Sequence, residues 1–154
     1  MEQFTIRMAT VADLKTLKDF EQQIIKAERP FDITLDTDPI SYYDLKELIL
    51  ADNATVLLAE SEGEVVGSGF GVIRDAKPFL DHRKYTYLGF MYTAEAYRGK
   101  GVNKRIVDAL LAWSKTKGIK EVRLTVYEDN NPAIRAYEKV GFKKHLIEMR
   151  LGLD

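Results

Sequence analysis

A basic, glycine-containing segment in the second half of the chain has the residue types that bind anions. It spans residues 98–103, reads Arg-Gly-Lys-Gly-Val-Asn, and separates an aromatic strand-like run (residues 85–93) from an amphipathic helix-like run (residues 102–117). Glycines let backbone N–H groups approach a ligand closely, and a helix starting here points its partial positive end at the same place. The segment therefore predicts an anion site, with phosphate or pyrophosphate as the favoured ligand.

Two other phosphate-binding motifs do not fit this segment. A Walker loop needs Ser or Thr after its Gly-Lys pair, whereas Gly101 follows Lys100 here. The dinucleotide fingerprint needs a third glycine at the position that Lys104 occupies. A generic nucleotide-phosphate binder and an ordinary strand-to-helix turn remain the simpler alternatives.

The composition bounds the class of protein. At 154 residues, with 45% hydrophobic and 31% charged side chains, the chain predicts one globular domain over residues 1–154. The net charge of −1 argues against a nucleic-acid binder, which would show a basic excess. Cysteine is absent and only two histidines occur, so we expect neither a thiolate nucleophile nor a metal site. With no signal peptide and no apolar run of about 20 residues, we expect a cytoplasmic protein without membrane contact.

Hydrophobic periodicity and turn signals divide the chain into alternating strands and helices. Three glycines spaced by two residues in the second hairpin strand, Gly67, Gly69 and Gly71, leave one face bare for a ligand or another backbone. The order is β-α-α-β-β-β-α-β-α-β, an α/β domain with a mixed sheet. The expected strands are 4–8, 55–60, 64–74, 84–93, 121–126 and 142–151, and the expected helices are 10–25, 41–50, 102–117 and 131–140.

A second segment makes the pattern recognisable. Residues 130–142 read Asn-Asn-Pro-Ala-Ile-Arg-Ala-Tyr-Glu-Lys-Val-Gly-Phe. Together with the basic glycine loop and the element order, it resembles the GNAT superfamily of N-acetyltransferases, whose signatures are R/Q-x-x-G-x-G/A and Asn-x-x-Ala…Tyr-x-x-x-Gly-Phe. The resemblance covers nearly the whole chain, is strongest over residues 88–142, and implies a mostly antiparallel central sheet flanked by helices. Asn103 stands where that family usually has Gly or Ala; it could cap the helix, donate to a phosphate oxygen, or crowd the pyrophosphate.

The resemblance implies acetyl-CoA as cosubstrate. The loop would hold the pyrophosphate, the end of the fourth strand would hold pantetheine, and a backbone amide there would polarise the thioester carbonyl. Tyr137 matches the family's general acid for the leaving thiolate, and Asn130 matches a residue that orients the cofactor; a core tyrosine and a helix cap are the structural alternatives. The implied cofactor site comprises Met91, Tyr92, Thr93, Arg98, Gly99, Lys100, Gly101, Val102, Asn103, Asn130 and Tyr137.

The general base and the acceptor site are less well marked. An amine acceptor must lose a proton before it attacks, and Glu95 and Glu128 are candidate bases because they flank two strand ends. The simpler interpretation of each is a solvated surface carboxylate. Phe31, Asp32 and Tyr42 are candidates for the acceptor pocket, with Asp32 able to attract an ammonium, although core packing is the alternative for the aromatic residues.

These observations predict an enzyme that moves an acetyl group from acetyl-CoA to a primary amine by direct attack on the thioester. The alternative is a non-catalytic acyl-CoA-binding module that acts as a sensor or scaffold. Residues 141–154 leave little room for the two final strands that the family usually has. The last strand is therefore short, merged with its predecessor or exchanged with another protomer, which makes a homodimer a reasonable expectation.

Overall fold

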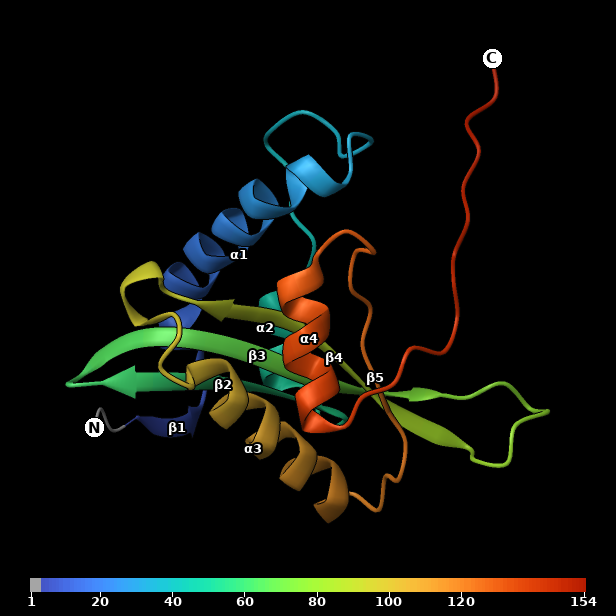
Figure 1. The fold of residues 1–154 in the computed structure, drawn as a ribbon. Coiled ribbons are helices and arrows are strands. Elements are labelled where there is room, and N and C mark those ends of the chain that lie inside the picture. The colour runs from blue at the N-terminus through green and yellow to red at the C-terminus, as the bar shows by residue number, and fades with distance from the viewer. Residues whose placement is uncertain (1–3) are drawn as a thin grey trace.

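The computed structural model describes residues 4–154, which form a five-stranded sheet in the order β1-β2-β3-β4-β5. The first four strands pair antiparallel, and β5 pairs parallel to β4 (Figure 1). This confirms the expected mixed, mostly antiparallel sheet. The strands are β1 (Thr5–Met8), β2 (Ala54–Ser61), β3 (Glu64–Asp75), β4 (Lys84–Thr93) and β5 (Val122–Arg123).

Helices cover the sheet on both faces. Within residues 4–154, the α-helices are α1 (Leu14–Glu28), α2 (Leu45–Leu50), α3 (Val102–Thr116) and α4 (Asn131–Val140). Because successive strand side chains point to opposite faces, β2 contributes Leu57 to one core cluster and Leu58 to the other. The first cluster includes α3, and the second includes α1 and α2, so the sheet lies between two apolar layers.

The bare face of β3 lies against helix α3. A Cβ atom at Gly67 would come within 2.7 Å of Val102 Cγ1, and one at Gly69 within 2.8 Å of Ile106 Cγ2. A side chain at either position would collide with the neighbouring side chains unless they moved. The alternating glycines therefore let α3 pack close to the sheet, which places the start of α3 beside the end of β4.

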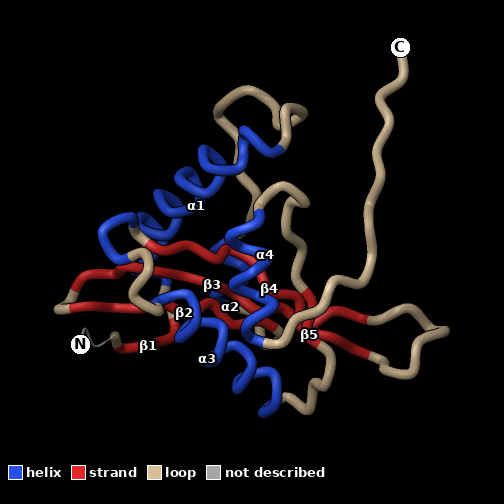
Figure 2. Tube along the Cα trace, in the orientation of Figure 1, coloured by secondary structure: helices blue, strands red, loops and turns tan. Residues whose placement is uncertain are grey.

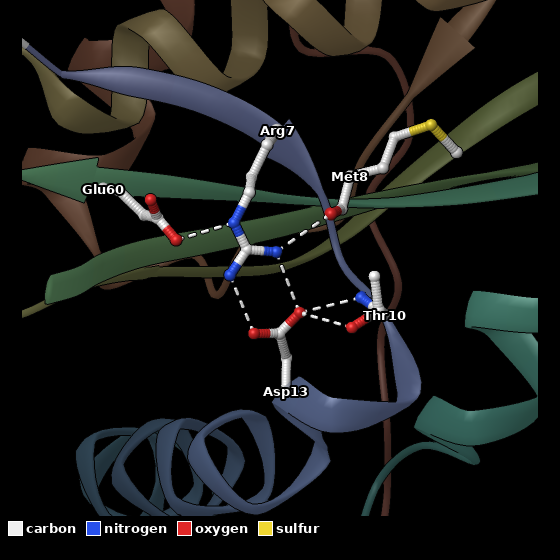
Figure 3. Close-up of polar contacts among 5 residues, drawn as sticks. All are labelled: Arg7, Met8, Thr10, Asp13 and Glu60. Carbon is white, nitrogen blue, oxygen red and sulfur yellow. Dashed lines mark hydrogen bonds and ion pairs between the residues drawn. The ribbon is translucent and has the colours of Figure 1, made fainter. Parts of the chain in front are cut away.

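A polar network holds β1 against the helix that follows it (Figure 3). The Arg7 guanidinium donates to both carboxylate oxygens of Asp13, at 2.8 and 2.9 Å, and its Nε donates to Glu60 at 2.6 Å. Asp13 also accepts from the backbone N–H of Thr10 at 2.7 Å, as part of a capping box. The Arg7 guanidinium lowers the pKa of Asp13 to about 2, so the carboxyl group is ionised at neutral pH.

The predicted helix over residues 41–50 begins later, at Leu45. The backbone N–H groups of Tyr42 and Tyr43 donate to Glu21 Oε2, at 2.9 and 2.8 Å, and this holds the preceding segment out of the helix. Asp44 then caps α2 by accepting from the Glu47 N–H. Helical spacing alone could not reveal this competition, because Glu21 is distant in sequence.

The last part of the chain departs most from the prediction. The strand expected over residues 121–126 is reduced to Val122–Arg123, and the strand expected over residues 142–151 is not formed. Instead, the chain beyond α4 runs away from the sheet as an extended segment with no secondary structure (Figure 2). The apolar alternation was read correctly as extended backbone, but a strand also needs a neighbouring strand to pair with, and none lies beside this segment within residues 4–154.

Candidate active site

A cavity of about 310 Å³ opens where β4 ends. It lies among the C-terminal half of α1, the end of β4, the start of α3 and one side of α4. The residues that line it are Gln23, Ile24, Ala27, Glu28, Phe31, Met91, Tyr92, Thr93, Arg98, Asn103, Asn130, Ala133, Ala136 and Tyr137. The basic glycine loop and α4 lie apart in sequence, and both contribute residues to this cavity.

A β-bulge turns the end of β4 toward this cavity. Ser68 of β3 pairs with Tyr92, whereas Phe70 pairs with Gly89, so β4 carries an extra residue between the two pairs. Phe90 has a φ of +58°, and its buried side chain anchors the bulge in the core. The Ser68 hydroxyl donates to the Phe90 carbonyl at 3.0 Å and fixes the distorted backbone.

The parallel strands β4 and β5 separate just before this bulge. β4 pairs with β5 only at Thr86 with Val122 and Tyr87 with Arg123. Within the described residues, no strand pairs with this side of β4 from residue 88 to its end at Thr93. The backbone groups along this edge are therefore available to an extended ligand, in the way that a peptide adds to a sheet edge.

The basic glycine loop has the conformation that an anion cradle requires. Gly99 and Gly101 both have left-handed backbone, with φ of +77° and +86°. A Cβ atom at either position would meet nothing within 4 Å, so the space above the loop is open. Since α3 begins at Val102, its first N–H groups lack intrahelical acceptors and point toward this space.

Side chains at the two ends of the loop connect it to the cavity. Arg98 Nε donates to the Thr93 carbonyl at 3.2 Å and so ties the loop to the end of β4. Arg98 and Asn103 line the cavity, whereas the residues between them do not. Val102 is buried in the core and can offer only its backbone. Gly99, Lys100 and Gly101 lie exposed on the surface.

Tyr137 reaches the cavity from α4. Asn130 caps this helix by accepting from the Ala133 N–H at 3.4 Å, and the Tyr137 ring meets Phe142 edge-on at 5.9 Å. Burial raises the pKa of Tyr137, and the neighbouring Asn103 side chain opposes part of this rise. The phenol therefore keeps its proton at neutral pH. Asn103, the position that departs from the family signature, lies beside the tyrosine that the signature singles out.

The structure places a carboxylate in the cavity that sequence reasoning missed. Glu28 ends α1 and lines the cavity with Tyr137, and burial raises the pKa of Glu28 while the nearby Tyr42 hydroxyl opposes the rise. Glu95 and Glu128, the carboxylates predicted as candidate bases, are exposed and do not line it. The available signal was helical spacing, because Glu28 falls four residues after Ile24 on the inward side of α1.

The predicted acceptor residues divide into different places. Phe31 lines the cavity and stacks on Tyr127 at 5.8 Å. Asp32 does not line it; its carboxylate accepts from Thr34 and pairs with Arg150 at 3.2 Å, contacts that lower the pKa of Asp32 to about 2.

Tyr42 lies beside Glu28 and outside the cavity lining. Its hydroxyl is buried and makes no well-formed hydrogen bond within the described part of the chain. Burial raises the pKa of this hydroxyl, and the nearby Glu28 raises it further. Tyr42 therefore adds to the environment of Glu28 without touching the cavity directly.

The described residues offer no obvious metal site and no membrane span. Across residues 4–154, no three His, Asp or Glu side chains come together in a way that could hold a metal ion. In the same range, no helix has the length and apolar character needed to cross a bilayer.

Comparison with known proteins assigns the family. Residues 21–142 match the model of the Acetyltransferase (GNAT) family. The chain therefore belongs to the GNAT acetyltransferases, which confirms the resemblance seen in the sequence. The chain is also 30% identical over 102 residues to YokL of Bacillus subtilis, described as an uncharacterized N-acetyltransferase derived from the SPbeta prophage. This match covers 65% of the chain and spans about half, 54%, of that relative's length.

Solved structures support the same fold. A tetramutant of the BH1408 protein from Bacillus halodurans superposes with a TM-score of 0.81 and 26% identity, over 97% of this chain and 99% of that one. A predicted acetyltransferase from Clostridium acetobutylicum, solved with acetyl-CoA, gives a TM-score of 0.73 at 18% identity, over 97% and 96% of the two chains. The second identity is low enough that the likeness speaks to the fold alone.

Proposed function

We propose that this chain, acting as one domain over residues 1–154, transfers an acetyl group from acetyl-CoA to a primary amine. The observation that carries the proposal is the single cavity that joins Arg98 and Asn103 of the glycine loop, the bulged end of β4, and Tyr137. Each group suits one part of an acyl-CoA. The family match and the acetyl-CoA complex of a protein with this fold support the choice of ligand.

Binding would begin at the glycine loop. The N–H groups at the start of α3 and the positive charges of Arg98 and Lys100 suit the diphosphate of CoA. The open space above Gly99 and Gly101 leaves room for its oxygens. The unpaired edge of β4 would then receive the extended pantetheine arm through backbone hydrogen bonds.

The bulged end of β4 would hold the thioester. One backbone N–H among Met91, Tyr92 and Thr93 would donate to the thioester carbonyl oxygen and stabilise the negative charge that develops on it. A donor of this kind contributes about 3 kcal/mol to the transition state in other acyl-transfer enzymes. The rigid anchoring of Phe90 in the core keeps that donor in place during the reaction.

Proton transfer would involve two side chains of the cavity. Glu28 accepts a proton from the incoming ammonium, directly or through water, and the neutral amine attacks the carbonyl carbon. The C–S bond breaks, and the departing thiolate takes the proton of the Tyr137 phenol. As the tetrahedral intermediate collapses, the new amide nitrogen gives its remaining extra proton through water to the Tyr137 phenolate, and solvent removes the proton on Glu28. The raised pKa of Glu28 brings it closer to the pH at which a base of this kind works well.

The acceptor would enter between α1 and α4. Phe31 lines this side of the cavity, with Tyr127 stacked behind it. An aromatic face next to a carboxylate suits a cationic amine, which gains from the ring quadrupole as well as from the negative charge. The acceptor class that this wall favours is therefore a primary amine carried on a small or flexible group.

The Tyr137→Phe variant tests this function. We expect kcat to fall about 100-fold while the affinity for CoA stays within twofold, because the phenol acts on the leaving group and not on the diphosphate. CoA release is followed with acetyl-CoA and a panel of primary amines, and CoA binding by calorimetry. Tyr97→Phe is the control, since the Tyr97 hydroxyl reaches Glu64 at 3.4 Å and does not line the cavity.

The same measurements separate an enzyme from a binding module. Tight CoA binding by the unmodified chain, without turnover of any amine in the panel, would favour the sensor or scaffold alternative. Equal kcat values for Tyr137→Phe and the unmodified chain would remove Tyr137 from the mechanism.

A further inference from the structure

A buried hydroxyl without a partner lies beside the carboxylate of the cavity. The Tyr42 hydroxyl oxygen is shielded from solvent and makes no well-formed hydrogen bond to any of residues 4–154. Leaving a buried polar group unpaired costs free energy, so such a group in a folded protein needs an explanation. The Glu28 carboxylate lies close to this hydroxyl, and Glu28 lines the cavity. The proposed mechanism uses Glu28 and gives Tyr42 no role.

Helix α1 sets the distance between the two groups. Glu21 is 3% exposed, and its Oε2 accepts from the backbone N–H groups of Tyr42 and Tyr43 at 2.9 and 2.8 Å. Glu28 lies two helical turns later, about 10.5 Å along the same side of α1, and its side chain leans back toward the start of the helix. The Tyr42 side chain spans most of this interval. Its hydroxyl therefore reaches the Glu28 carboxylate while Glu21 holds its backbone.

The other titratable side chains around Glu28 have different partners or tasks. They are Arg98 from the glycine loop, Tyr137 from α4, Tyr43 from the segment before α2, and Tyr127 from the connection between β5 and α4. Tyr127 donates to Asp32 at 3.4 Å, and the phenol on α4 serves the leaving thiolate. The Tyr43 hydroxyl lies at the backbone of β4. Tyr42 is therefore the phenol whose proton is available to Glu28.

We propose that Tyr42 is the positioning residue of the candidate base: its phenol donates a hydrogen bond to one carboxylate oxygen of Glu28 and leaves the other oxygen facing the cavity. This inference rests on the proposed function, in which Glu28 takes a proton from the incoming ammonium. A small rotation of the Glu28 side chain completes the hydrogen bond, because the hydroxyl and the carboxylate already lie close together. One contact thus satisfies the buried hydroxyl and orients the base.

The hydrogen bond also controls the charge on Glu28. Burial disfavours the ionised carboxylate and raises its pKa, and a phenol that donates to the carboxylate opposes this rise. A base must be ionised at the working pH and must also hold the proton well once it has accepted it. Burial supplies the second property, and Tyr42 supplies the first. Tyr42 keeps its own proton, because burial and the nearby Glu28 raise its pKa well above the ordinary value.

Carbon-13 NMR of the side-chain carboxyl groups tests the proposal in the full chain without ligands. The Glu28 signal is assigned by its loss in Glu28→Gln, and its titration midpoint is measured across the acid and neutral range. Tyr42→Phe should raise that midpoint by about one pH unit, because a hydrogen bond to the ionised form is lost. Tyr85→Phe is the control and should leave the midpoint unchanged, since Tyr85 lies at the start of β4, with its ring 4.0 Å from the Arg123 guanidinium, and does not line the cavity.

A more acidic phenol at the same place should act in the opposite direction. Site-specific replacement of Tyr42 by 3-fluorotyrosine keeps the ring and the hydroxyl and strengthens the hydroxyl as a donor, so the Glu28 midpoint should fall below that of the unmodified chain. This variant decides the question even if Tyr42→Phe is too unstable to titrate, since it leaves the buried hydroxyl in place. A tyrosine with a purely structural role would alter the thermal stability and leave the Glu28 midpoint where it is.

The pH–rate profile extends the test to turnover. In Tyr42→Phe, the acid limb of kcat/KM should move to higher pH by the same interval as the NMR midpoint, because kcat/KM reports the groups of the free enzyme. Equal Glu28 midpoints in the unmodified chain and both Tyr42 variants overturn the proposal. A shifted midpoint with an unmoved acid limb also overturns it, since Tyr42 would then act on a carboxylate that turnover does not use.

The NMR result does not depend on acetyl transfer. If the midpoints shift as expected in a chain that acetylates no amine, the hydrogen bond between Tyr42 and Glu28 is upheld and the proposed function fails. If the chain acetylates amines and the midpoints stay equal, the proposed function stands and the role of Tyr42 fails. The two failures are therefore distinguishable.

Discussion

Residues 4–119 and residues 120–154 differ in burial: the first part contains all the buried residues of the described chain, and the second contains none. The first part encloses a sheet between two apolar layers, with α1 and α2 on one side and α3 on the other. The second part, residues 120–154, contributes a two-residue strand, a half-covered helix and an extended segment. The candidate site lies where the two parts meet.

This division separates two tasks within the site. The glycine loop and the bulged end of β4 belong to residues 4–119, which we call the closed part because core packing fixes its backbone. Tyr137 belongs to residues 120–154, which we call the open part because α4 and its neighbours contain no buried residue. We infer that binding of the CoA moiety depends mainly on the first part, and that the proton-transfer step depends on how well the second part is held.

The largest expected contrast is in stability. Leu17→Ala removes a fully buried side chain from the α1 layer and should lower the free energy of unfolding by about 2–5 kcal/mol. Leu151→Ala makes the same change on a side chain that is 85% exposed. At concentrations where the chain is a single copy, its effect should be below about 0.5 kcal/mol. Urea denaturation measures both, and equal losses would mean that the final segment packs within one copy.

The next contrast is between two glycines with the same backbone strain. Gly101→Val and Gly118→Val each place a β-branched residue at positive φ, +86° and +75°, with nothing within 4 Å of the new Cβ. Both should lose similar stability, about 1–2 kcal/mol. Only Gly101→Val should weaken CoA binding, at least 100-fold, because its side chain fills the space above the loop. Calorimetry with CoA decides, and unchanged affinity in Gly101→Val would remove the loop from the binding site.

A third test concerns the base. Glu28→Gln should lower kcat by about 10- to 100-fold, since a positioned base contributes at least this much. The unmodified enzyme should lose activity as the pH falls through the raised pKa of Glu28, because only the ionised carboxylate accepts a proton. In Glu28→Gln this acid limb should disappear from the pH–rate profile.

The matched controls for that test are Glu95→Gln and Glu128→Gln. Both carboxylates are exposed and lie outside the cavity lining, so both variants should keep the full rate and the acid limb. Loss of the limb in either one, with Glu28→Gln unaffected, would return the base to the residues that the sequence suggested.

The fold was predictable where local pattern and packing agree. The apolar residues of β2, β3 and β4 face two core clusters, and the apolar stripe of α3 faces the glycines of β3. Each of these patterns is therefore compatible with one type of secondary structure. The short β5 and the final segment without strand pairing were not predictable in this way. Periodicity reports which face of a strand is apolar, and it says nothing about whether a neighbouring strand is present.

The candidate site was predictable from its backbone and less so from its side chains. The glycine loop is recognisable because its residues are adjacent in sequence. Tyr137 is recognisable by its spacing before Gly141 and Phe142. Helical spacing places Glu28 on the inward side of α1, but Glu28 reaches the cavity because α1 crosses the end of β4, a tertiary relation that spacing does not carry. Asp32 was placed at the acceptor pocket by its local sequence, but its carboxylate forms an ion pair with Arg150, a residue far along the chain.

The smallest expected effect lies at the surface of the closed part, in the Arg7–Asp13 pair (Figure 3). Arg7 holds the pKa of Asp13 at about 2, below its ordinary 3.8, so the ionised form stabilises the fold. This contribution is present above about pH 4 and is lost as the pH falls from 4 to 2. Since the Arg7 side chain is 35% exposed, solvent screening reduces it to about 1 kcal/mol.

Asp13→Asn should therefore lower the free energy of unfolding by about 1 kcal/mol at pH 7 and should lose less stability than the unmodified chain between pH 4 and 2. Asp108→Asn is the control, because Asp108 makes an exposed helix pair with Lys104 at 2.8 Å that contributes about 0.3 kcal/mol. Urea denaturation across this pH range measures all three proteins. If Asp13→Asn and the unmodified chain lost the same free energy of unfolding between pH 4 and 2, β1 would be held by its backbone pairing with β2. The Arg7–Asp13 ion pair would then contribute nothing to the stability of this edge of the sheet.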